Sequence, residues 1–163
     1  MTQLEDFVAA AREFSTWCLT QPSEPTEEAG VAIRHLARLY SLALDLRSPE
    51  NVNFDLDGQG SSDVVWQQVY KRAGALPFHH YSLVGDALAV PTDAVNVGDL
   101  ADDIADIHRD LAEGLSLYDA GHQPEAAYTF RFTFQLHWGT HAAEAISALH
   151  SWLARDWQLV SDP

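Results

Sequence analysis

Two histidines near the end of the chain, His137 and His141, are four residues apart. This spacing places both imidazoles on one face of a helix, where two such rings can chelate one metal ion. Glu144, three residues further on, offers a carboxylate as a third ligand. The residue after His137 is Trp138, where the helical metalloprotease motif has a glutamate, so that class of protease is excluded.

A group of aspartates lies in the expected helix that precedes the one carrying these histidines. Asp102, Asp103 and Asp106 lie in the stretch 100–118, and a short connection at 119–123 separates it from the histidine-bearing segment. A short connection favours antiparallel packing, which pairs residues equally distant from the turn. We therefore expect His137 level with Asp106, and His141 level with Asp102 and Asp103, so that one aspartate supplies a fourth ligand.

The same residues are compatible with other roles. Buried histidines usually hydrogen-bond to a carboxylate, so a His–Asp network that sets the packing of two helices needs no metal. Acid–base catalysis is a third interpretation, and exposed histidines with no common role are a fourth.

The elements that position this cluster are helices. Apolar residues recur at helical spacing, which predicts helices over about 3–19, 27–46, 63–73, 100–118 and 124–157. Thr2 with Glu5 forms a capping box for the first helix, and Thr26 is the expected N-cap of the second. We expect a further short helix or turn over 77–85, and loops over 49–62 and 91–98. The predicted fold is all-α: one domain over 1–163, a bundle of about five main helices with short extra helical turns.

One part of the last helix is ambiguous. Tyr128, Phe130, Phe132 and Phe134 alternate with polar residues, which is also strand periodicity. No turn residue separates this tract from the helical pattern of 142–153, and a two-stranded pairing is marginal by itself. We expect a helix with a kink at Gly139.

Charge is the strongest feature of the composition. The 163 residues include 24 acidic and 9 basic side chains, a net charge of −15. Such a chain repels nucleic acids and anionic membranes, whereas a basic protein partner is attracted. No apolar run is long enough to span a membrane, no signal peptide is evident, and the single cysteine excludes an internal disulfide. We expect a cytoplasmic protein.

Several segments in the last two thirds of the chain are similar to a known bacterial family. These are the run from Gly98 to Gly114, Tyr118 to Gly121, Phe134 to Ala142, Ala148 to His150, and Ala75 to Pro77. They resemble the family catalogued as domain of unknown function 5063 over roughly the last two thirds of the chain. The resemblance implies a compact helical cytoplasmic domain and supplies no activity.

Two functions follow as hypotheses. The first is an acidic protein-binding module, an adaptor or inhibitor of a basic partner that needs no cofactor. The second is a protein that binds a divalent transition metal, or a metal-dependent hydrolase, using His137, His141, Glu144, Asp102, Asp103 and Asp106.

Overall fold

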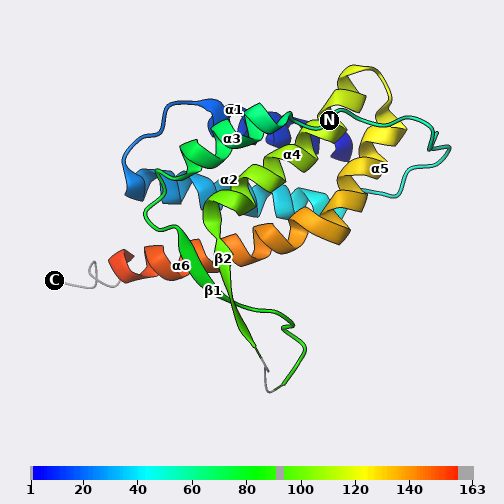
Figure 1. Ribbon diagram of the computed structural model, residues 1–163. Helices are drawn as coiled ribbons and strands as arrows, with labels where there is room; N and C mark the ends of the chain where they lie inside the picture. Colours follow the sequence, from blue (N-terminus) through cyan, green and yellow to red (C-terminus); the bar gives the residue numbers. More distant parts are fainter. Residues whose placement is uncertain (1, 91–93, 158–163) are drawn as a thin grey trace.

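The computed structural model describes residues 2–90 and 94–157, and within them the chain is mostly helical. The order of elements is α1 (Gln3–Leu19), α2 (Pro25–Asp45), α3 (Asp63–Ala73), β1 (His80–Val84), β2 (Val95–Asp99), α4 (Leu100–Asp119), α5 (Gln123–Thr133), a π-helical turn η1 (Phe134–Trp138) and α6 (Gly139–Trp157). Since α5, η1 and α6 run on without a break, the bundle has five main helical segments in the described part. The predicted helical bundle is confirmed, and Figure 1 shows its long helices packed side by side.

The helix ends follow local capping chemistry at three places. Thr2 and Glu5 form the predicted capping box of α1, and Ser62 and Asp99 cap α3 and α4 through their side-chain oxygens. The prediction for the second helix was wrong: α2 begins at Pro25, and its N-cap position is Glu24, with no side-chain cap. Proline suits the first helical position because its fixed φ is already helical, so the helix starts before Thr26.

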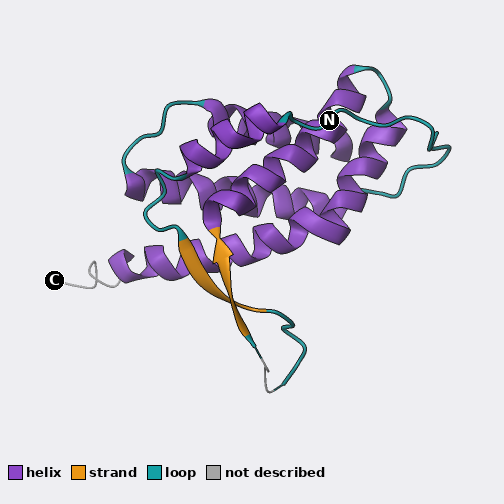
Figure 2. Ribbon diagram, in the orientation of Figure 1, coloured by secondary structure: helices purple, strands orange, loops and turns teal. Residues whose placement is uncertain are grey.

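The segment between α3 and α4 is a β-hairpin, which corrects the short helix or turn expected over 77–85 and the loop expected over 91–98. β1 and β2 pair antiparallel with Tyr81 opposite Gly98, and the hairpin projects from the bundle (Figures 1 and 2). Gly98 leaves the space that the Tyr81 ring occupies, since an added Cβ would overlap the ring. Residues 91–93 of the expected loop lie outside the described residues.

The Phe-rich tract is helical, as predicted, and two of its aromatic rings lie in the core, whereas Phe132 is 47% exposed. Phe130 and Trp138 are fully buried, and the Phe130 ring lies 4.8 Å from the ring of Phe7 on α1. Gly114 on α4 lets Phe130 approach, because a Cβ there would overlap that ring. The irregularity expected at Gly139 is the π-helical turn that ends just before it.

The segment 49–62 contains no helix or strand, as predicted, and is held against α4 and α5 by hydrogen bonds. The backbone N–H of Asn53 donates to Glu125 Oε1 at 2.8 Å, and that of Gln59 donates to Ser116 Oγ at 2.7 Å. Among the described residues, no helix combines the length and the apolar character that crossing a bilayer requires.

Candidate functional site

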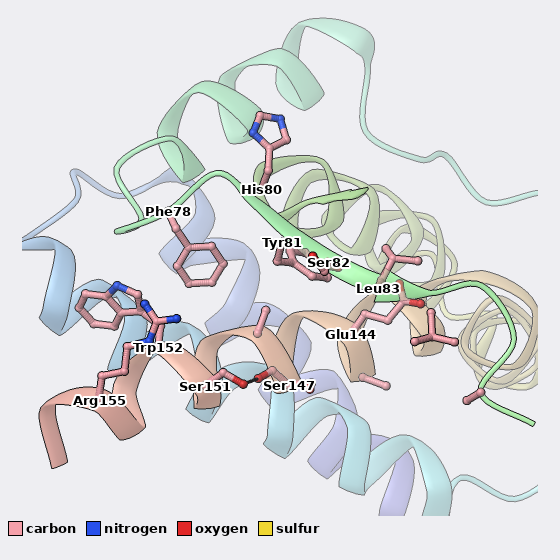
Figure 3. A pocket seen from close by; sticks show the side chains of 14 residues that line it. Phe78, His80, Tyr81, Ser82, Leu83, Glu144, Ser147, Ser151, Trp152 and Arg155 are labelled. Atoms are coloured by element: carbon pink, nitrogen blue, oxygen red, sulfur yellow. Dashed lines mark hydrogen bonds between the residues drawn. The ribbon is translucent and has the colours of Figure 1, made fainter. Parts of the chain in front are cut away.

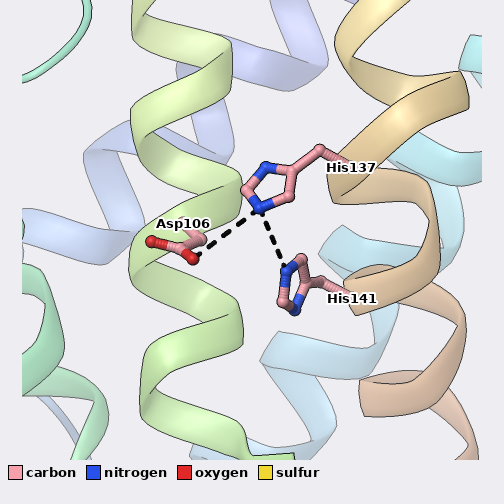
Figure 4. A group of neighbouring side chains, drawn as sticks. All are labelled: Asp106, His137 and His141. Atoms are coloured by element: carbon pink, nitrogen blue, oxygen red, sulfur yellow. Dashed lines mark hydrogen bonds and ion pairs between the residues drawn. The ribbon is translucent and has the colours of Figure 1, made fainter. Parts of the chain in front are cut away.

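The candidate site lies where α4 faces the junction of η1 and α6. Asp103, Asp106 and Asp110 occupy one side of α4 at spacings of three and four residues, which brings their carboxylates to one face. His137 comes from η1 and His141 from the first turn of α6. Figure 4 shows both imidazoles between the two helices, with His137 joined by dashed lines to Asp106 and to His141.

Each imidazole is held at Nδ1 by a carboxylate of α4. His137 Nδ1 lies 2.7 Å from Asp110 Oδ2, and His141 Nδ1 lies 2.7 Å from Asp103 Oδ1. The side chains of Asp103 and Asp110 are 5% and 14% exposed, so both carboxylates are fixed by their surroundings. These bonds orient the Nε2 atoms of the two rings toward each other, 3.3 Å apart.

A third group, Asp106, reaches the same point. Its Oδ2 lies 3.9 Å from His137 Nε2. One ligand atom from each of Asp106, His137 and His141 falls within 4.8 Å of the other two. The other oxygen of Asp106, Oδ1, accepts a hydrogen bond from Trp66 Nε1 on α3 at 2.7 Å. Asp106 is therefore oriented so that one oxygen remains available.

The hairpin also contributes to this arrangement. The Tyr81 hydroxyl donates to Asp103 Oδ2 at 2.6 Å, while Asp103 Oδ1 accepts from His141. Burial and the bond to Asp103 raise the pKa of Tyr81, so the phenol stays protonated as the donor. Both oxygens of a buried carboxylate are thus satisfied.

The hydrogen bonds at Nδ1 decide what the two Nε2 atoms can do. An ionised carboxylate only accepts, so each imidazole donates its Nδ1–H to its aspartate. In the neutral imidazole the other nitrogen then carries a lone pair and no hydrogen. Two such lone pairs facing each other at 3.3 Å repel unless a proton or a cation lies between them.

The spacing of the atoms fits a metal ion. Two imidazole nitrogens at about 2.0–2.1 Å from a tetrahedral ion are about 3.3 Å apart, which is the separation of the two Nε2 atoms. The Asp106 oxygen lies further away, 3.9 Å from His137 Nε2, so its side chain would have to move closer to complete the ligand set. Hydrogen bonds from imidazole Nδ1–H to carboxylates are typical outer partners of histidines that bind metal ions.

The electrostatics of the site also favour a cation. Burial, with a contribution from nearby carboxylates, raises the pKa values of Asp102, Asp110 and Glu144. The hydrogen bond to Asp103 raises the pKa of His141, against the effect of burial. The smaller contributions from neighbouring carboxylates reflect negative charge at the site, which positive charge on an imidazole or a bound ion relieves.

The structure brings together most of the residues singled out from the sequence. Asp103, Asp106, His137 and His141 meet as expected, while neither histidine is hydrogen-bonded or ion-paired to Asp102. Glu144 points instead toward a cleft beneath the hairpin (Figure 3). His137 is also less buried than expected, with 47% of its side chain exposed.

Three residues of the site were missed. Asp110 lies one turn beyond Asp106 on the same face of α4, so the helical spacing could have identified it. Trp66 and Tyr81 hold Asp106 and Asp103 from α3 and β1. No pattern in the sequence connects them to the cluster, because only the tertiary fold brings them close.

Fold and site together define a helical bundle with a protruding hairpin and a polar cluster between α4 and α6. The chain belongs to the family described as domain of unknown function DUF5063, which matches residues 2–155 and so includes the first two helices. A comparison with curated proteins gives no significant match. A crystal structure of protein BF1032 from Bacteroides fragilis is similar, with a TM-score of 0.74 and 17% identity over 99% of this chain and 94% of that chain. At this identity the likeness shows the fold alone.

Proposed function

We propose that the protein binds a divalent transition-metal ion through Asp106 Oδ2, His137 Nε2 and His141 Nε2. The observation that carries the proposal is the pair of Nε2 atoms, 3.3 Å apart, in rings whose Nδ1 atoms both contact carboxylates. A structural His–Asp network explains the Nδ1 bonds. A metal ion would in addition use the second oxygen of Asp106, which lies 3.9 Å from His137 Nε2 while Trp66 holds the first.

The ligand set favours some ions over others. Two imidazoles with one carboxylate suit zinc, ferrous iron, cobalt or nickel, whereas magnesium and calcium prefer oxygen ligands. Three protein ligands leave a coordination position for water, which is the pattern of catalytic rather than structural zinc sites. The exposure of His137 gives solvent access to that position. Metal-assisted hydrolysis is the chemistry this arrangement would support.

The proposal is tested on protein purified without a histidine tag and stripped with a chelator. Adding zinc or ferrous ion at a 100-fold excess over the dissociation constant should raise the free energy of unfolding by about 2.7 kcal/mol. Calorimetry should give one equivalent bound. His137→Ala and Asp106→Ala should each abolish the gain, while Asp102→Asn, a charge-matched control on the same helix, should retain it.

The opposite result is equally clear. If the untagged protein holds less than about a tenth of an equivalent of any transition metal, and neither ion changes its melting temperature, the proposal fails. The cluster is then a structural network.

We also propose a second function, binding of a basic protein partner. Its specific support is the hairpin segment, where Leu88, Val90 and Val95 are 91%, 88% and 66% exposed. Apolar side chains gathered on a protruding element are typical of interaction sites. The net charge of −15 favours encounter with a basic protein.

This second proposal is tested by capture from a lysate at increasing salt. A specific basic partner should be retained at about 0.05 M salt and released well above 0.1 M. A Leu88→Ser/Val95→Ser variant should lose it. Leu44→Ser should not, because Leu44 is 63% exposed on α2, away from the hairpin. A partner retained equally by all three proteins contradicts a role for the hairpin.

A further inference from the structure

A cleft of about 620 Å³ lies between the hairpin and α6. All five residues of β1 line one side, and the facing side of α6 contributes Ala143, Glu144, Ser147, Ala148, Ser151, Trp152 and Arg155. Figure 3 shows β1 crossing above α6, with Phe78 and Trp152 near one end and Glu144 toward the other. Because residues of both faces of β1 line the cleft, the cleft runs along the edge of the strand.

The pairing register identifies which backbone groups of β1 are free. The N–H of Leu100 donates to the carbonyl of His79, and the register pairs His80 with Asp99 and Tyr81 with Gly98. In an antiparallel ladder, hydrogen-bonded and non-hydrogen-bonded pairs alternate. Tyr81 and Leu83 therefore pair with β2, and the N–H and carbonyl groups of His80, Ser82 and Val84 point away from it.

These outward groups have no partner in the part of the chain that the structure describes. No hydrogen bond joins the backbone of His80, Ser82 or Val84 to another described residue on this edge, and all three residues line the cleft. Free donors and acceptors on a strand edge form a template for another strand. The cleft thus offers a backbone ladder as well as apolar surface.

The dimensions of the cleft suit an extended chain. The five residues of β1 span about 17 Å at about 3.4 Å per residue. From Ala143 to Arg155, α6 rises about 18 Å at 1.5 Å per residue. Ala143, Ser147, Ala148 and Ser151 are small, so a strand can approach the helix closely.

We propose that this cleft binds an extended peptide segment of a basic protein, which pairs with the free edge of β1 as a third strand. The inference rests on the protein-binding proposal above and names the form in which the partner binds. Alternate side chains of the bound segment lie on the small residues of α6. A lysine or arginine of the segment lies at the end of the cleft where Glu144 is located. Arg155 at the opposite end favours a carboxylate of the segment.

The test begins with a random heptapeptide library displayed on phage and selected on the full chain. The tightest peptide is then made synthetically and measured against two proline variants. Ser82→Pro removes an N–H on the cleft edge and should weaken binding about tenfold. Val97 is opposite Ser82 in a non-hydrogen-bonded pair, so its backbone N–H points to the far edge of β2. Val97→Pro therefore places a proline ring away from the cleft and should leave binding unchanged.

A second measurement does not depend on the folding of a variant. The selected peptide is methylated at alternate backbone nitrogens. It keeps its side chains but loses the N–H donors along one edge of the extended peptide. Methylation in the register that faces β1 should abolish binding to the unchanged protein, and methylation in the other register should be tolerated. Cross-strand contacts of Tyr81 with Gly98, measured by NMR, confirm that the hairpin persists in Ser82→Pro.

Three results overturn the inference. If the peptide binds Ser82→Pro normally, and if both methylated forms of the peptide bind the unchanged protein normally, then contact occurs without strand pairing. That result leaves the protein-binding proposal intact. A selection that yields no peptide shows that the edge does not accept extended chains, whereas a folded partner would still appear in the salt-dependent capture. A concentration-dependent dimer lost in Ser82→Pro shows that the edge serves a second copy of this chain.

Discussion

The bond between His141 and Asp103 is the more buried of the two His–Asp bonds in the candidate site. Their side chains are 24% and 5% exposed, and Asp103 also accepts from Tyr81. Removing one member of a buried pair costs more than the pair contributes, because the remaining polar group keeps its desolvation penalty. Loss of either partner should therefore weaken the contact between α4 and α6, with or without a metal ion.

Replacing this histidine should destabilise the fold. His141→Leu leaves Asp103 Oδ1 without its donor and should lower the free energy of unfolding by about 1–3 kcal/mol. Denaturant unfolding of the metal-free protein measures it. Thr140→Leu, at an exposed neighbouring position, should stay within about 0.5 kcal/mol of the unchanged protein. Equal stability of both variants would show that the His141–Asp103 bond contributes nothing.

At the scale of elements, the π-helical turn η1 joins two helices and carries His137. A π-turn inserts one extra residue into a helix, and such turns are frequent at functional sites. Gly139 follows it directly, and a Cβ there would overlap the backbone oxygen and the ring of Phe134. A glycine is thus required where the chain returns to α-helical geometry.

A substitution at this glycine tests that requirement. Gly139→Ala should destabilise the protein by about 1–3 kcal/mol, because backbone must shift to admit the methyl group. Gly30→Ala is the matched control within α2, where a Cβ would meet only the flexible end of Arg34 at 3.4 Å. It should be neutral or stabilising by up to about 1 kcal/mol, since alanine favours helix. Thermal unfolding of both variants decides, and equal losses would contradict the proposed role of Gly139.

At the scale of the whole molecule, one ionic network joins three helices. Glu28 on α2 accepts from Trp17 Nε1 at 3.0 Å and from the Ser23 N–H at 2.8 Å, and lies 2.6 Å from Arg72 of α3. Burial by itself raises the pKa of Glu28, but the bond from Ser23 and the Arg72 guanidinium outweigh it, and the pKa is lowered. The folded state therefore prefers the ionised carboxylate.

The lowered pKa predicts the dependence of stability on pH. A glutamate whose pKa is lower in the folded state stabilises the fold above its unfolded pKa, near pH 4.3, and loses that contribution as the pH falls through the folded pKa. The difference in unfolding free energy between the unchanged protein and Glu28→Gln should be largest near pH 7 and shrink below about pH 4. Glu27→Gln, at an exposed neighbour, should show a small difference that hardly varies with pH. A difference for Glu28→Gln that grows on acidification would contradict the sign.

Much of the helical architecture could be predicted from local sequence. α1, α3 and α4 begin where Thr2, Ser62 and Asp99 cap them, because capping is a contact between near neighbours in the chain. It could also be predicted that His137 and His141 lie approximately opposite the aspartates of α4. A short connection fixes an antiparallel register to within about a turn.

The hairpin and the outer partners of the site could not be predicted. β1 and β2 are five residues each, and a two-stranded pair is only marginally stable by itself, so local sequence offered no reason to expect one. The hairpin depends on Tyr81 filling the space at Gly98 and reaching Asp103, contacts between segments far apart in the chain.

The amino-acid sequence alone determined the helices, their order and the presence of two imidazoles opposite a row of carboxylates, since spacing and caps act over one or two turns. The tertiary structure alone decided which oxygen meets which nitrogen, and that Trp66 and Tyr81 hold Asp106 and Asp103. It also decided that one edge of a strand remains unpaired above α6. These depend on distances of a few ångströms between separate elements, which only the packing of the whole chain establishes.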